Sequence, residues 1–204
     1  MADAPILIGR ALEPDWSAEP DLDKLRHCKA LLQTDRLLAL RGLEELADSG
    51  SIMSMLYLAH EHGHGALSSR NLEASINWYE RAINAGSVLA SFHLGLLYKG
   101  VGRFAEAFDA FKVGAEADLA ASIYQLGRMY RDGLGVSKNL QEAQELWDRA
   151  SVLGHPYAKR NVACFLISGR RGILNVPRGF LLLFAAIFQT FRLSMYEPTS
   201  YLLK

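Results

Sequence analysis

Small and apolar residues recur at helical spacing along most of the chain, and glycines interrupt this pattern at regular intervals. Between Ser122 and Tyr130 they lie three or four positions apart, as on one face of a helix, before a Gly-x-Gly break. Asn139 then predicts the cap of a second helix, which ends at Gly154. The inward side of this helix is predicted to hold Ala143, Leu146, Trp147 and Ala150. The pattern therefore predicts two helices joined by a glycine turn.

The same pattern occurs earlier in the chain, shifted by 68 residues without a gap. A shorter copy lies between the two, and the chain before and after them fits only parts of the pattern. The residues that close successive hairpins are 36, 32 and 36 positions apart, at Gly50, Gly86, Asp118 and Gly154. A period of this length is typical of solenoids, in which each hairpin buries its apolar face against its neighbours. We therefore predict an all-α array of about four hairpins with capping segments.

The repeat register divides the chain into seven segments. The first is extended because it is rich in proline, and Asp21 or Asp23 is expected to cap the first helix. The predicted segments are an extended N-terminus at 1–20, capping helices at 21–50, repeats at 51–86, 87–118, 119–154 and 155–190, and a tail at 191–204.

The repeat pattern resembles that of the Sel-one-like repeat (SLR) family, A-x3-L-G-x2-Y-x2-G-x-G-V followed by D-x3-A-x2-W-Y-x2-A-x3-G. The third hairpin matches best, although Asn139 replaces the usual aspartate and Ser122 the usual alanine. The middle hairpin is four residues shorter and looks more like a tetratricopeptide repeat. The resemblance covers residues 35–190. It implies a right-handed α/α superhelix that binds a protein or peptide along its concave face, as an adaptor or scaffold without catalytic machinery.

The outward positions of each first helix are the predicted partner-binding face. At 100° per residue, the positions two before, one before and two after the repeat leucine point away from the stack. They combine aromatic side chains with arginine, which are typical interface anchors. Packing against the adjacent hairpin is the alternative role of these positions. The predicted binding residues are Tyr57, His60, Phe92, His93, Tyr124, Gln125, Arg128 and Arg160.

One segment also matches the H-E-x-x-H pattern of zinc hydrolases, with His60, Glu61 and His64 in the motif positions and Glu80 as a possible third ligand. The repeat register already explains this segment, because it places a repeat position at His62. A helix that stops near here also leaves His64 in the turn and spoils the i, i+4 geometry that zinc needs. We therefore expect no metal, no cofactor and no catalytic residue, and we treat a zinc hydrolase as a remote alternative.

The segment 180–191 is apolar nearly all round and contains more large side chains than one helix face can bury. It is shorter than the roughly 20 residues of a bilayer span. Three covers are possible: the chain's own tail, a partner or second copy of the chain, and a membrane surface. An alternative function is therefore a peripheral membrane-complex assembly factor that docks through this helix. The residues of this secondary apolar surface are Phe180, Phe184, Ile187, Phe188 and Phe191.

Charge and cysteine content restrict the setting. The chain has 22 basic and 22 acidic residues, which predicts no long-range field toward nucleic acid or an anionic membrane. Cys28 and Cys164 are far apart and form no disulfide framework, and the N-terminus lacks the long apolar run of a signal peptide. These features predict a cytoplasmic protein, with membrane association as the alternative, and a protein partner rather than nucleic acid.

Overall fold

The computed structural model describes residues 19–64, 71–169 and 172–196. Most of the predicted extended N-terminus and most of the tail that was one possible cover for the apolar helix lie outside these residues. Every regular element within the described ranges is helical. The chain divides into two compact units between Arg103 and Phe104.

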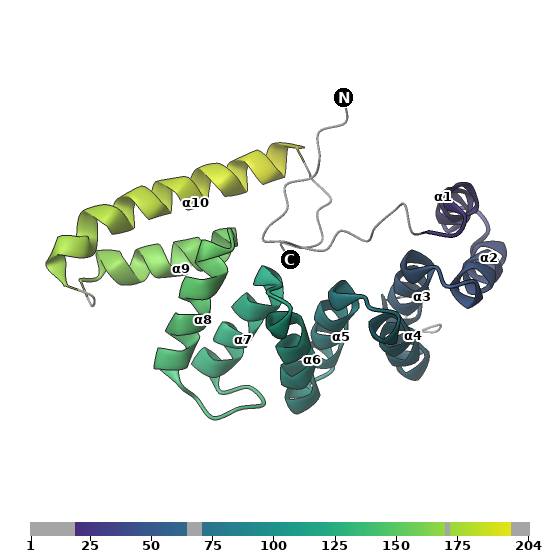
Figure 1. The fold of residues 1–204 in the computed structure, drawn as a ribbon, viewed down its shortest axis with the longest axis horizontal. Coiled ribbons are helices and arrows are strands. Elements are labelled where there is room, and N and C mark those ends of the chain that lie inside the picture. The colour runs from purple at the N-terminus through teal and green to yellow at the C-terminus, as the bar shows by residue number, and fades with distance from the viewer. Residues whose placement is uncertain (1–18, 65–70, 170–171, 197–204) are drawn as a thin grey trace. The chain divides into compact units, whose positions relative to one another are not determined.

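The first unit contains the capping helices, the first repeat hairpin and the first helix of the shortened hairpin. Asp21, one of the two predicted caps, accepts a hydrogen bond of 2.9 Å from the backbone amide of Lys24 at the start of the first helix. Asp35 and Asn71 cap later helices in the same way. The helices, coloured purple to teal in Figure 1, are α1 (Leu22–Leu31), α2 (Arg36–Asp48), α3 (Ile52–His64), α4 (Leu72–Asn84) and α5 (Val88–Gly100).

The second unit begins with the other helix of the shortened hairpin and ends with the apolar helix. The side chain of Asn139 accepts hydrogen bonds from the amides of Gln141 and Glu142, both at 3.1 Å, which confirms the predicted cap. The elements are α6 (Phe104–Glu116), α7 (Ala120–Asp132), α8 (Leu140–Val152), α9 (Pro156–Ile167), a short 3-10 helix η3 (Ile173–Asn175) and α10 (Val176–Tyr196). Within this unit α10 lies alongside α9 (Figure 1).

Each predicted closing residue adopts a positive φ. The angles are 98° at Gly50, 97° at Gly86 and 95° at Gly154, and Asp118 has the same sign at 58°. Among the described residues Asp118 is the one non-glycine with such an angle, and aspartate tolerates it better than most side chains do. The repeat register therefore identified the points at which the backbone turns left-handed.

An arginine in the second helix of a hairpin reaches back to an acid at the end of the preceding hairpin. In the first unit, Arg81 Nη2 lies 3.0 Å from Asp48 Oδ1. In the second unit, Arg149 Nη2 lies 2.6 Å from Asp118 Oδ1 and donates a hydrogen bond of 2.8 Å to the carbonyl of Ala115. Because Arg81 and Arg149 are 68 positions apart, they occupy the same repeat position. These surface pairs connect successive hairpins within each unit.

The loop between α7 and α8 packs against the start of α6 at Gly135. This residue has a φ of 71°, and a Cβ atom there would overlap the carbonyl group of Phe104. Gly169 has the same φ of 71°, but no atom would lie within 4 Å of its added Cβ. The two glycines thus separate the cost of a left-handed backbone from the cost of steric overlap.

We predict that Gly135→Ala lowers the free energy of unfolding by about 3 kcal/mol, from backbone strain plus overlap with α6. Gly169→Ala is the control and should cost about 1 kcal/mol, from backbone strain alone. Urea unfolding followed by circular dichroism measures both values. Equal losses would show that the 133–138 loop moves away from α6 at little cost.

Candidate functional site

The predicted binding residues differ widely in exposure. His60 and Arg160 are exposed, and Tyr57, His93, Tyr124 and Arg128 are half-buried. The outward orientation predicted for Phe92 and Gln125 is wrong, because their exposed fractions are 1% and 5%. These two side chains are not available to a partner in this structure.

The burial of Phe92 and Gln125 follows from how the first helices are enclosed. On α5 the residues from Ala90 to Leu94 are buried at four of five positions, which form more than one face of a helix. On α7 the buried residues likewise run from Ala120 to Ile123 without a break. The sequence register assigned one buried face to each first helix, whereas α5 and α7 are buried on more than one face. Only a narrow strip of each first helix is left accessible.

In the first unit, this strip carries Tyr57 and His60 on α3 and His93 on α5. Lys29 Nζ lies 5.6 Å from the centre of the Tyr57 ring. The His93 ring stacks on Tyr79, with centroids 6.1 Å apart. Tyr79 is almost fully buried, and burial raises the pKa of its hydroxyl above the ordinary value. Of the three accessible residues, His93 thus rests on a buried aromatic ring.

In the second unit, the strip forms an aromatic cluster that the sequence identified only in part. We call Tyr124, His155, Tyr157 and Arg160 the Tyr124 cluster. The Tyr124 and His155 rings stack with centroids 4.4 Å apart, and the Tyr157 ring lies 6.2 Å from Tyr124. The Arg160 guanidinium lies 5.3 Å from the centre of the Tyr157 ring. Tyr124 and Arg160 were predicted binding residues, and the structure brings them together through two residues that the prediction missed.

His155 holds the cluster at the start of α9. Its Nδ1 atom accepts a hydrogen bond of 3.3 Å from the backbone amide of Ala158, which makes it the cap of α9. Burial lowers the pKa of the imidazole from 6.5 to about 4, because the charged form loses its hydration. Its proton at neutral pH is therefore on Nε2. The signal for this role was the histidine directly before Pro156, since proline is typical of the first turn of a helix.

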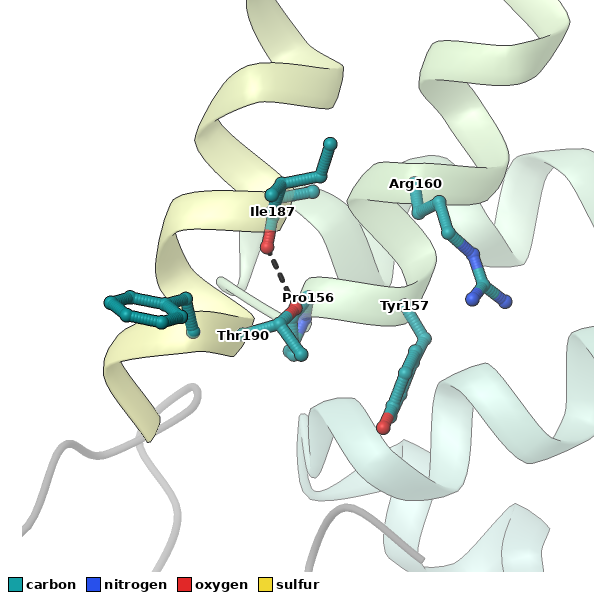
Figure 2. A pocket seen from close by; sticks show the side chains of 7 residues that line it. Pro156, Tyr157, Arg160, Ile187 and Thr190 are labelled. Carbon is teal, nitrogen blue, oxygen red and sulfur yellow. Dashed lines mark hydrogen bonds between the residues drawn. The ribbon is translucent and has the colours of Figure 1, made fainter. Parts of the chain in front are cut away.

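A cavity of about 400 Å³ lies between α9 and α10, next to the Tyr124 cluster (Figure 2). The hydroxyl of Thr190 donates a hydrogen bond of 2.7 Å to the carbonyl of Ala186, so it is already satisfied by its own helix. Apart from this hydroxyl, Arg160 and the tip of Tyr157 supply the polar side-chain groups of the lining. The lining residues are Pro156, Tyr157, Arg160, Ala186, Ile187, Thr190 and Phe191.

The His60, Glu61 and His64 motif lies on α3, whose last residue is His64, so the prediction that His64 lies in the turn is wrong. The Glu61 carboxylate lies 3.1 Å from Arg36 Nε, and its backbone carbonyl accepts a second bond of 3.0 Å from Arg36 Nη2. The carboxylate that would activate water is therefore paired with a guanidinium. Among the described side chains, which exclude that of His64, no group of three histidine, cysteine, aspartate or glutamate residues is placed to hold a metal.

Cys164 and His155 do not form a nucleophile and base pair. Both belong to α9, His155 as the cap and Cys164 nine residues later. At 1.5 Å per residue they are about 13 Å apart along the helix axis, far beyond hydrogen-bond distance.

Comparison with known proteins identifies the repeats. The Sel1 repeat pattern matches residues 52–87 and 120–155, which contain the hairpins α3–α4 and α7–α8. The protective antigen c5321 of uropathogenic Escherichia coli, which displays an SLR fold, is 26% identical with a TM-score of 0.61 over 80% of this chain. A Sel1 repeat protein from Oxalobacter formigenes is 24% identical with a TM-score of 0.57 over 74% of this chain.

MamA has the same helical fold, with 15% identity and a TM-score of 0.55 over 84% of this chain and 98% of its own. The chain spans 36% of the length of c5321 and 62% of that of the Oxalobacter protein. These matches confirm the all-α solenoid fold class and the SLR resemblance.

The buried imidazole of His155 makes stability depend on pH. Since its pKa in the folded chain is about 4, below 6.5, the unfolded chain binds a proton that the folded chain excludes between these values. The stabilisation is present above about pH 6.5 and is lost as the pH falls toward 4. We expect the free energy of unfolding to drop by about 2 kcal/mol from this residue between pH 7 and pH 5.

Urea unfolding at the two pH values, in the wild type and in His155→Asn, measures this contribution. Asparagine keeps a helix-capping side chain but does not titrate. The drop should be smaller in the variant by about 2 kcal/mol, and equal drops in both proteins would show that His155 is already solvated in the folded state.

Proposed function

Because the chain contains two Sel1 repeats, we propose that it is a non-enzymatic adaptor or scaffold that binds a protein or peptide along the accessible strip of its first helices. Sel1 repeats generally mediate protein–protein interaction, and proteins built from them are generally non-catalytic scaffolds. What we propose beyond this general role is that the partner binds to the accessible strip of the first helices.

The observation that carries the proposal is the accessible strip of α7, where Tyr124 and Arg128 lie one helical turn apart. Both are half-buried, and the Tyr124 ring is held by its stack on His155. A side chain that is already ordered loses little conformational entropy when a partner binds, so it is a favourable anchor. Tyrosine and arginine are also the residue types that most often dominate interface energies.

The alternative of a zinc hydrolase has less support. Its general base would be Glu61, which is paired with Arg36. Docking of α10 on a membrane would use a different surface.

The proposal is tested by photo-crosslinking in cell extract. Benzoylphenylalanine is placed at Arg128 or at His60, on first helices, and at the exposed residues Glu145 or Glu80 on second helices as matched positions. A crosslinked protein should appear from the first-helix positions and not from the second-helix positions. Crosslinks from Glu145 and Glu80 alone would place the binding face on the other side of the hairpins.

Once a partner is identified, its affinity should be measured by calorimetry. Arg128→Glu should weaken binding at least tenfold, roughly the effect of losing one interface anchor. Lys112→Glu makes the same change of charge at an exposed position of α6 and should leave the affinity unchanged. Equal effects of the two variants would mean that net charge, rather than the α7 strip, determines binding.

A further inference from the structure

The rotation of α10 about its own axis is fixed by its contact with α9. A Cβ atom on Gly179 would lie 2.9 Å from the backbone nitrogen of Ile167, so only glycine permits this approach. Two helical turns further on, Ala186 is 2% exposed. Near the other end of α10, the side chain of Gln189 donates a hydrogen bond of 2.8 Å to the carbonyl of Gly154. It also accepts a hydrogen bond of 2.8 Å from Lys159 Nζ. One face of α10 is therefore committed to α9.

The face of α10 that is turned away from this seam carries a continuous stripe of large apolar side chains. Their exposed fractions range from 49% at Phe180 to 73% at Leu181. On a helical wheel they fall within about 120°, and they extend for about 17 Å along the helix. A soluble surface rarely exposes so many adjacent aromatic rings without using them. We call these residues the Phe stripe: Phe180, Leu181, Phe184, Ile187, Phe188 and Phe191.

Every charged residue in the segment that contains α9 and α10 is basic. Residues 149–196 contain seven basic and no acidic residues, although the whole chain is balanced at 22 of each. Beside the stripe, Arg178 is an exposed residue of α10, and Arg160 lines the cavity that Ile187 and Phe191 also line (Figure 2). Among the described residues, no carboxylate lies within ion-pair distance of Arg160 or Arg178. The net charge of the whole chain is therefore zero although this segment is basic.

We propose that α10 docks on an anionic lipid surface, with the Phe stripe inserted at the boundary of headgroups and acyl chains and the arginines on lipid phosphates. An aromatic face bordered by basic residues is the pattern of helices that lie in the membrane interface. The stripe is about 17 Å long against a hydrocarbon thickness of about 30 Å, so the helix lies along the surface. Among the described residues no helix is long and apolar enough to span a membrane.

The charge of the α9–α10 hairpin favours an anionic lipid surface over a second copy of the chain as the cover of the Phe stripe. Two α9–α10 hairpins meeting through their stripes would bring basic residues together, with no acid on either hairpin to pair with them. An anionic bilayer supplies the missing negative charge across the whole face. The proposal uses neither α3 nor α7, and Arg160 is the one residue that it shares with the predicted first-helix binding residues.

The test is sedimentation of the full chain with vesicles of about two parts phosphatidylcholine to one part phosphatidylglycerol, against pure phosphatidylcholine. Phe184→Glu/Phe188→Glu changes two residues of the stripe that are 72% and 68% exposed, so folding should be retained. Leu37→Glu/Leu140→Glu is the matched control, because these residues are 75% and 60% exposed on α2 and α8. Circular dichroism checks the helical content of each variant.

The wild type should bind the anionic vesicles at least about thirtyfold more tightly than the neutral ones, and added salt should weaken this binding. The stripe variant should lose at least about thirtyfold in affinity, and the control should bind like the wild type.

Three results would overturn the proposal. The first is absence of wild-type binding to anionic vesicles, and the second is an equal loss in the control variant. The third is a dimer without lipid that the stripe variant abolishes, since the stripe would then be an interface between copies of the chain.

Discussion

Close approach of consecutive helices at small residues is the constraint on which both units depend. Ser75 on α4 donates a hydrogen bond of 2.6 Å to the backbone carbonyl of Ala59 on α3, which requires both helices to present small side chains there. At the equivalent crossing of α7 and α8, a Cβ on Gly127 would lie 2.7 Å from Trp147 Cδ1. Gly179 performs the same role between α9 and α10. Larger residues at these crossings would separate the helices and expose the apolar faces that stabilise them.

This constraint explains why the sequence predicted so much of the fold. A small residue at each crossing and a left-handed residue at each closing turn recur with the repeat, so alignment of the copies predicted the helical hairpins, the cap at Asn139 and the closing turns. The binding strip was harder to predict. Periodicity within one helix shows which residues face its hairpin partner, but Phe92 and Gln125 lie outside that predicted face and are buried all the same. His155 was missed because its role requires two side chains that are 31 residues apart, Tyr124 and itself, to stack.

The total charge was the least informative sequence property. A balance of 22 basic and 22 acidic residues predicted no attraction toward an anionic membrane, yet every charge in residues 149–196 is positive. Electrostatic attraction decays within about 10 Å at moderate salt, so a surface responds to the charges close to it rather than to the sum over the chain. The composition of a single hairpin is the relevant scale for a repeat protein, in which each hairpin contacts only its neighbours.

The arginine pairs between successive hairpins give the array a direction. Arg81 and Arg149 each reach back to an acid that the preceding hairpin supplies, Asp48 in one case and Asp118 in the other. In each pair the arginine lies in the last turn of a second helix, and the acid lies at the end of the preceding second helix. The small residues at the crossings are compatible with many orders of the hairpins. If a hairpin followed a neighbour that lacks the acid, its arginine would have no carboxylate to pair with. The surface ion pairs therefore depend on the order of the hairpins along the chain. Exchange of hairpins during evolution or design must keep both the arginine and the acid of each pair.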